Sequence, residues 1–384
     1  MSMRNTALAL LLTSVAVFAE SHAAYTVTLG YLTEHSDLVV VATAGPEARP
    51  GRVAFTVTGV LRGALDGAAI VVARRDGEAA YAVGTRILAF LRRDGDIWRP
   101  LSRTFGMRPV PDDGPASRFP GIVRAIAGTL GEGLEVAAPD GLRTLLVAGM
   151  ADPDAGIAWS AAMDFVRHES LHAALTAEQR TRILDAYRGR PVGKDTKHAL
   201  AHAVAVTKDP GAAELLISSL RDPRAREIRV AVGAALRRLA DPAASRHVVE
   251  FLKTARPAQR ADGLTVLGFL GTKEAALAAR DHLGDAVREV RVTAAHVLGL
   301  AARALRARDP EADVAIDGQD RLEQLLKNAA HENEMRAALW ALAQLDRPAA
   351  YDVLRAAAAN DPRETVRRYA ARYLRRPRQS LLLR

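Results

Sequence analysis

The chain of 384 residues contains no cysteine. This absence excludes disulfide bonds, thiol chemistry and zinc sites with cysteine ligands, so the fold must be stabilised by packed apolar surface. The sequence also lacks the G-x-S-x-G, Walker A and G-x-G-x-x-G patterns of nucleophile elbows and phosphate-binding loops. Only six of the 53 basic residues are lysine and alanine is abundant, so the net charge of +9 indicates a GC-rich bacterial genome as much as selection for charge.

Long apolar runs are also scarce, and the one that stands out lies at the N-terminus. Residues 7–18 are apolar, between a positive charge at Arg4 and the small residues Ala23 and Ala24. This order is typical of a secretory signal peptide, and about a dozen apolar residues are too few for a membrane anchor. The sequence therefore predicts that residues 1–23 are a signal peptide and that the mature protein is soluble and periplasmic or secreted.

Arginine recurs at a fixed interval in the second half of the chain. The positions are 31 residues apart except for one gap of 45, which is a repeat with a 14-residue insertion: Arg229, Arg260, Arg291, Arg336 and Arg367. One further step back leads to His198, which opens a similar apolar stretch. A unit of this length cannot bury its own apolar face, so the units must stack into a solenoid.

The pattern inside each repeat is helical. Positions three, four, six and seven after each arginine are apolar or small, which places them on one stripe of a helix. A break with Gly or Pro and a second amphipathic run follow, so each unit is two antiparallel helices. We expect residues 197–376 to be mostly helical, with four leucines buried between neighbouring units: Leu236, Leu267, Leu298 and Leu374.

Two copies, beginning at Asp285 and Asp361, share the core D-x-x-x-x-V-R-x-x-A-A. Over residues 195–376 this core resembles the short HEAT-like repeats of the phycobilisome-lyase type. The resemblance implies an α-solenoid and protein interaction, whereas nothing in the sequence marks a bilin site. Asp222, Asp285 and Asp361 stand where helix N-caps belong. The repeated arginine is expected to bond to the loop of a neighbouring unit as a structural ladder.

The first part of the chain reads as β structure after a short helix at 29–36. Four short β-branched runs are bounded by turn residues: 37–42, 53–61, 68–73 and 86–91. Five or six strands in so short a segment predict a small barrel or sandwich. The segments S-D-L-V-V, V-L-R-G and G-T-R-I-L-A-F-L resemble exported domains of the tissue-inhibitor/netrin-like type, which implies an OB-like barrel. The predicted organisation is a signal peptide, a barrel domain, a linker with leading helices and helical repeats: 1–23, 24–110, 111–150 and 151–384.

One catalytic pattern is present. His168, Glu169 and His172 match H-E-x-x-H, in which two histidines one helical turn apart bind zinc and the glutamate activates water. Residues 158–175 look helical, and Thr176 with Gln179 looks like a capping box for the next helix. No G-x-x-H follows to supply a third ligand, and the motif lies at the entry to a solenoid without a substrate cleft. We therefore expect no bound metal, no cofactor and no enzymatic activity, and keep a zinc-dependent hydrolase as the alternative.

Two charged segments are candidate binding surfaces. The insertion holds four acidic residues on what is expected to be a loop of the binding face: Asp309, Glu311, Asp313 and Asp317. The basic C-terminal segment interleaves tyrosines at 369 and 373 with arginines: Arg368, Arg372, Arg375 and Arg376. A solvated cap on the last repeat is the simpler interpretation, and a polyanion site is the alternative. Export argues against nucleic acid as the natural partner, so the predicted function is a non-catalytic, exported protein-binding scaffold.

Overall fold

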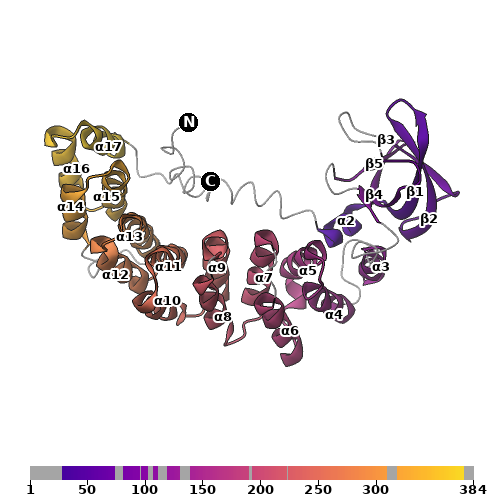
Figure 1. Cartoon of the computed structure of the whole chain (residues 1–384), viewed down its shortest axis with the longest axis horizontal. Helices are drawn as coiled ribbons and strands as arrows, with labels where there is room; N and C mark the ends of the chain where they lie inside the picture. The colour runs from indigo at the N-terminus through magenta and orange to yellow at the C-terminus, as the bar shows by residue number, and fades with distance from the viewer. Residues whose placement is uncertain are drawn as a thin grey trace. The chain divides into compact units, whose positions relative to one another are not determined.

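The computed structural model describes residues 28–73, 81–95, 97–102, 107–110, 119–129, 139–189, 193–222, 224–308 and 318–375. The chain divides into two compact units, Met1–Thr207 and Lys208–Arg384, called unit 1 and unit 2 below. Unit 1 combines a small β-barrel with helices, and unit 2 is helical throughout its described part (Figure 1). None of the described helices is long and apolar enough to cross a membrane. The predicted signal peptide lies outside the described residues, and the predicted domain boundaries stay predictions.

The elements of unit 1 are α2 (Leu29–His35), β1 (Leu38–Arg49), β2 (Arg52–Arg62), β3 (Ala69–Ala73), β4 (Arg86–Asp94), β5 (Ile97–Pro100), β6 (Met107–Pro109), α3 (Phe119–Thr129), α4 (Pro139–Met150), α5 (Ala155–Arg167), the 3-10 turn η4 (Glu169–Leu171), α6 (Ala177–Arg188) and α7 (Lys194–Val206). The predicted short helix and the four predicted strands are therefore present. Strands β5 and β6 are additional to those runs.

The strands close into a barrel. The hydrogen-bonded order is β1-β2-β3-β5-β4, and β4 pairs again with β1, which closes the barrel. Strand β6 pairs with residues 87–89 of β4, on the edge of β4 opposite β1. All of these pairs are antiparallel except β3 with β5. The structure thus confirms a small barrel. At the turn after β2, Gly63 has φ +84° and a Cβ there would lie 2.2 Å from the carbonyl oxygen of Asp37, so only glycine fits.

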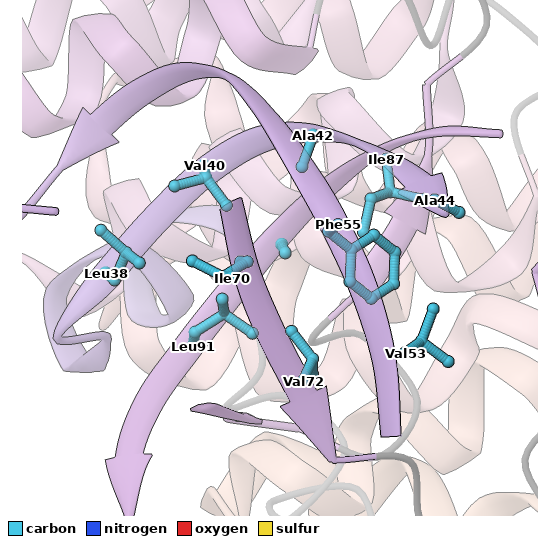
Figure 2. Packing of buried hydrophobic residues seen from close by; sticks show 11 residues of the cluster. Leu38, Val40, Ala42, Ala44, Val53, Phe55, Ile70, Val72, Ile87 and Leu91 are labelled. Atoms are coloured by element: carbon cyan, nitrogen blue, oxygen red, sulfur yellow. The ribbon is translucent and has the colours of Figure 1, made fainter. Parts of the chain in front are cut away.

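The barrel core follows the two-residue period of its strands. Alternate residues of four strands point inward and form one apolar cluster (Figure 2): Leu38, Val40, Ala42, Ala44, Val53, Phe55, Ile70, Val72, Ile87, Ala89 and Leu91. Val39, Leu88 and Phe90, which alternate with these residues along β1 and β4, are fully buried as well. Helix α2 contacts β4 and α3 contacts β2, so the barrel packs on helices within unit 1.

The elements of unit 2 are α8 (Ala212–Ser218), η5 (Ser219–Arg221), α9 (Ala225–Leu239), α10 (Ala244–Thr254), α11 (Pro257–Leu270), α12 (Lys273–Asp281), η6 (His282–Gly284), α13 (Arg288–Arg308), α14 (Gln319–Asn328), α15 (Glu332–Leu345), α16 (Pro348–Asn360) and α17 (Glu364–Arg375). Helices α9, α11, α13, α15 and α17 contact one another in sequence and form one layer (Figure 1). Each repeat is thus a helical hairpin, as predicted.

Small residues set the distance between neighbouring helices of this layer. A Cβ on Gly233 of α9 would lie 2.6 Å from the Phe269 ring of α11, and one on Gly299 of α13 would lie 2.7 Å from the Trp340 ring of α15. The aromatic rings therefore lie directly over the glycine backbone. Three predicted helix breaks are confirmed, because Ala240, Gly271 and Asp346 close their helices in the left-handed conformation.

The leucine prediction holds for three of its four residues. Leu236, Leu267 and Leu298 are at most 1% exposed. Leu374 is only partly buried. The reason is its place in the last described helix, α17, where no following unit in the described chain covers its outer side. The prediction for Leu374 is therefore wrong.

The repeated arginine forms a ladder between hairpins. Arg229 bonds to Asp262 at 2.6 Å, Arg260 to Asp285 at 2.9 Å and Arg291 to Glu334 at 2.5 Å. The ladder is confirmed for these three arginines, although only Asp285 belongs to a loop. Arg336 lies over the Tyr369 ring and Arg367 donates to the carbonyl oxygens of Asp361 and Pro362 instead.

The predicted N-caps need a correction. Asp222, Asp285 and Asp361 each accept a hydrogen bond from the amide two residues later. The following helices begin three residues after each aspartate, so these side chains form turns that precede the helices rather than caps on them.

Candidate functional site

The H-E-x-x-H segment does not form a continuous helix. Helix α5 ends at Arg167, and His168 has ψ 87°, outside the helical range. Glu169 to Leu171 then form a 3-10 turn, so the predicted helix over 158–175 is wrong beyond residue 167. The predicted capping box of Thr176 and Gln179 is present at the start of α6.

The two histidines of the motif bind different partners. His168 Nε2 lies 3.1 Å from Glu34 Oε1 and 3.2 Å from Arg167 Nη2. His172 Nε2 lies 2.8 Å from the carbonyl oxygen of Phe165, and Glu169 is exposed. Over the described ranges, no group of three or more His, Asp and Glu side chains is placed to hold a metal ion. These contacts do not favour the zinc-hydrolase alternative, because the two imidazoles do not converge on one point.

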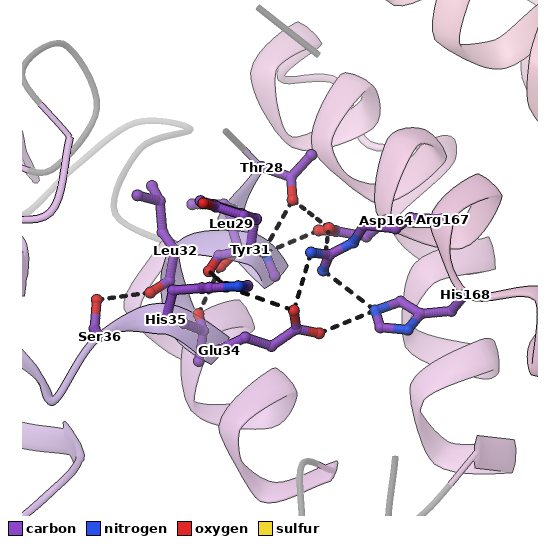
Figure 3. Close-up of polar contacts among 12 residues, drawn as sticks. Thr28, Leu29, Tyr31, Leu32, Glu34, His35, Ser36, Asp164, Arg167 and His168 are labelled. Carbon is purple, nitrogen blue, oxygen red and sulfur yellow. Dashed lines mark hydrogen bonds and ion pairs between the residues drawn. The ribbon is translucent and has the colours of Figure 1, made fainter. Parts of the chain in front are cut away.

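Instead, His168 belongs to a polar cluster between α2 and α5, made of Thr28, Glu34, Asp164, Arg167 and His168 (Figure 3). Arg167 joins its two carboxylates, with Nη1 2.9 Å from Glu34 and Nη2 3.2 Å from Asp164. Both carboxylate side chains are at most 6% exposed. Because buried charges require partners, this cluster fixes the short helix α2 to α5.

Asp164 and Ser160 of α5 accept hydrogen bonds from the first backbone amides of α2. Asp164 accepts hydrogen bonds from the Thr28 hydroxyl and from the Gly30 amide at 2.8 Å, and Ser160 Oγ accepts one from the Leu29 amide at 2.6 Å. A Cβ on Gly30 would lie 2.6 Å from the Asp164 carboxylate, so this approach requires glycine. The Thr28 hydroxyl caps α2 locally by accepting from the Tyr31 amide at 3.0 Å, and the carboxylate satisfies a further amide at the same helix end.

The pKa values of Asp164 and Glu34 are shifted in opposite directions. Burial raises the pKa of Asp164 above its ordinary value, against the lowering influence of Arg167, Thr28 and the Gly30 amide. Burial also opposes ionisation of Glu34, but the hydrogen bond to His168 and the charge of Arg167 outweigh it and hold the pKa below its ordinary value. Glu34 is therefore the firmly ionised partner of Arg167 and His168.

A pocket of about 190 Å³ opens beside this cluster. Its wall comes from α2, α3, α4 and α5 and is mostly aliphatic, with three polar residues, Asp152, Ser160 and Asp164. The polar groups of Ser160 and Asp164 are engaged by α2. The pocket can accept a small apolar group. Sequence reasoning missed Glu34 and Asp164, although an aspartate within the apolar helical run of residues 157–166 was an available signal.

The predicted basic surface is partly described. Arg368, Arg372 and Arg375 of α17 are exposed and form no ion pair with any described residue. The Tyr369 and Tyr373 rings stack with centroids 6.5 Å apart, and the Tyr369 hydroxyl lies 2.7 Å from Glu332 of α15. Arg376 and the four acidic residues of the insertion, Asp309, Glu311, Asp313 and Asp317, lie outside the described residues.

Two residues that the sequence reasoning did not single out as functional lie beside this surface. The Arg336 guanidinium of α15 stands 5.8 Å from the centre of the Tyr369 ring. Trp340, one turn further along α15, has its ring 5.3 Å from that of His296 on α13.

Two further histidines, His198 and His202, lie one helical turn apart on α7 of unit 1, and both side chains are partly buried.

Comparison with known proteins yields no family model and no curated relative. Solved structures do match. The chain is similar to human deoxyhypusine hydroxylase in complex with glycerol, at 20% identity and a TM-score of 0.28, over 68% of this chain and 98% of that chain. It is also similar to the complex of CpcE and CpcF of phycocyanin lyase from a Nostoc species, at 19% identity and a TM-score of 0.31, over 60% of this chain and 86% of that chain. The helical body fits the helical-repeat architecture of these proteins.

These two neighbours correct one prediction. Both carry the names of enzymes, a hydroxylase and a lyase. They contradict the prediction that this chain is not an enzyme, because a helical-repeat body of this kind does not exclude catalysis. That prediction is withdrawn.

Proposed function

We propose that this chain is an exported helical-repeat protein. It binds a partner protein through the outer face of the unit 2 layer that α9, α11, α13, α15 and α17 form. The signal-peptide pattern of residues 1–23 supports export. The stacked hairpins support binding, because such stacks present long rows of side chains on one face.

The observation that carries this proposal is the contrast between two sets of arginines. Arg229, Arg260 and Arg291 are partly buried and paired with carboxylates of neighbouring hairpins. Arg368, Arg372 and Arg375 are exposed, and no carboxylate in the described chain pairs with them. Arginine and aromatic side chains are both enriched at protein interfaces. The first set holds the stack together and the second set is free to bind.

The barrel of unit 1 is proposed to be of the tissue-inhibitor/netrin-like type. The closed order β1-β2-β3-β5-β4 with a parallel β3–β5 pair supports an OB-like barrel. No disulfide can stabilise this barrel, because the chain has no cysteine. Its core and the helices of unit 1 must do so.

Photocrosslinking in the source organism tests the proposal. A photoreactive residue replaces either Arg368 on α17 or Arg246, an exposed arginine of α10 in the other helix layer. We expect crosslinked proteins in the exported fraction from position 368 and few from position 246. Retention of the chain in the cytoplasm would contradict export, and an equal crosslink pattern at both positions would contradict binding through this layer.

A further inference from the structure

The arginine ladder of unit 2 is interrupted at Arg336. In the preceding hairpins the arginine at this repeat position reaches a carboxylate of the next unit: Arg229 to Asp262, Arg260 to Asp285 and Arg291 to Glu334. Arg336 lies over the ring of Tyr369 instead, with 5.8 Å between guanidinium and ring centre. Tyr369 follows Arg367 by two positions, as Asp262 follows Arg260. Asp361, which stands at the repeat position of Asp285, pairs with Arg363 instead, so Arg336 has no carboxylate partner among the described residues.

The neighbouring side chains extend this feature into a continuous surface. Trp340 follows Arg336 by one helical turn, and its ring lies over the backbone of α13 at Gly299. Arg368 and Arg372 stand one turn apart on α17, and Arg368 lies 5.3 Å from the Tyr369 ring. We call Arg336, Trp340, Arg368, Tyr369 and Arg372 the aromatic–arginine surface.

Helix geometry places these residues on one side of the layer. The buried residues of α15, among them Ala338 and Leu342, and those of α17, Val366 and Ala370, face the core. Arg336, Trp340, Arg368 and Arg372 lie on the opposite faces of the same helices, about 160° around the axis from Ala338 or Ala370. Tyr369 points sideways and bridges the two helices through Arg336 and Glu332. Arg368 and Arg372 are exposed and the other three members are partly buried, so the surface is accessible on the side that no second-layer helix covers within the described chain.

We infer that the aromatic–arginine surface binds an extended acidic segment of a partner protein, which rests on the proposed function and specifies its ligand. Guanidinium groups bind carboxylates through paired hydrogen bonds, and the Trp and Tyr rings offer faces for apolar side chains between the acids. Helix axes lie about 8–10 Å apart and an extended chain advances about 3.3 Å per residue, so a segment of about six residues spans the two spacings from α13 to α17.

The composition of the surface favours an acidic peptide over a uniform polyanion. Glu332 borders the surface and accepts a hydrogen bond from the Tyr369 hydroxyl at 2.7 Å. A polyanion that carries a negative charge on every monomer is repelled by this carboxylate, whereas a peptide can place a neutral residue beside it. The aromatic rings between the arginines also match alternating acidic and apolar side chains.

The test uses the full chain and fluorescein-labelled synthetic peptides of about eight residues, long enough for the three helices by the spacing above. One peptide alternates Glu and Phe, and a second alternates Lys and Phe. Heparin and a single-stranded oligonucleotide are the polyanion probes. Fluorescence anisotropy gives the affinities at low and high salt. The variants are Arg336→Gln, Arg372→Glu and Trp340→Phe, with Arg246→Glu as the matched control for a charge change on α10.

We expect the acidic peptide alone to bind, with about tenfold weaker affinity in Arg372→Glu and Arg336→Gln, and unchanged affinity in Arg246→Glu. Tighter binding of heparin or the oligonucleotide, with the same sensitivity to these variants, overturns the proposal in favour of a polyanion site. A dimer in sedimentation velocity that Arg372→Glu dissociates assigns the surface to a second copy instead, which also overturns it. If the peptide does not bind while crosslinking at position 368 still captures exported proteins, this inference fails and the proposed function stands. Thermal melts of each variant show whether a lost affinity comes from unfolding.

Discussion

Arg229 Nη1 lies 2.6 Å from Asp262 Oδ1, and the two residues belong to successive hairpins of unit 2. Both side chains are largely buried, at 19% and 8% exposure. Burial raises the pKa of Asp262 above its ordinary value, although the hydrogen bond and charge of Arg229 lower it. Arg229 therefore compensates the Asp262 carboxylate, whose burial without a partner would destabilise the fold.

We predict that Arg229→Ala destabilises unit 2 by about 3 kcal/mol, because removal of one partner leaves a buried charge without compensation. The double variant Arg229→Ala with Asp262→Ala should recover part of this loss. Urea unfolding of both variants measures it. A double variant that is no more stable than Arg229→Ala alone would contradict this account.

A second prediction compares two leucines at the same repeat position. Leu267→Ala should cost about 2–5 kcal/mol through lost burial and a residual cavity, since Leu267 is completely buried. Leu374→Ala should cost clearly less, because Leu374 is only partly buried at the end of the stack. Equal losses in denaturant unfolding would mean that other residues cover Leu374 in solution.

The third prediction concerns pH and Glu34. The folded-state pKa of Glu34 is lowered, so ionised Glu34 stabilises the fold above its ordinary pKa, and this contribution is lost as the pH falls through the folded-state value. Glu34→Gln should therefore destabilise unit 1 at neutral pH and have little effect well below about pH 4. The fluorescence of Trp159 on α5 reports the unfolding.

For Asp164 we expect the opposite dependence of stability on pH. Its folded-state pKa is raised, so its ionisation disfavours the fold, and stability falls as the pH rises through that value. Asp164→Asn keeps the size of the side chain and should remove this dependence. A pH profile identical to that of the unaltered protein would contradict the assignment.

The fourth prediction separates a structural from a metal-binding role of the H-E-x-x-H residues. His168→Ala removes a partner of Glu34 and should speed hydrogen exchange of the α2 amides, because α2 is fixed to α5 through this cluster. His172→Ala should leave exchange in α2 nearly unchanged, since His172 bonds to Phe165. Elemental analysis of both variants completes the test: one zinc per chain that either substitution removes would restore the hydrolase alternative.

Much of the fold could be predicted from the sequence because its signals lie close together along the chain. The spacing of Arg229, Arg260 and Arg291 predicted the hairpins, and the β-branched run of residues 53–61 predicted strand β2. Both patterns are local, so a single sequence carries them in full.

The site was less readable because distant residues define it. The end of α5 at Arg167 has no Gly or Pro to announce it, and His168 bonds to Glu34, which precedes it by 134 residues. The pairing of Arg336 with Tyr369 likewise depends on how two hairpins stack. Neither contact follows from spacing within one element, and the H-E-x-x-H match was misleading for this reason.

Every bond of the arginine ladder joins only adjacent hairpins, and this makes the number of hairpins adjustable. Residues 257–287 span one 31-residue period and include both Arg260 and Asp285. A tandem duplication of this segment in the gene would add a hairpin together with its own ion pair and would leave the others intact. Lineages of this protein can therefore differ in length by whole periods, and an engineer can lengthen the stack in the same steps.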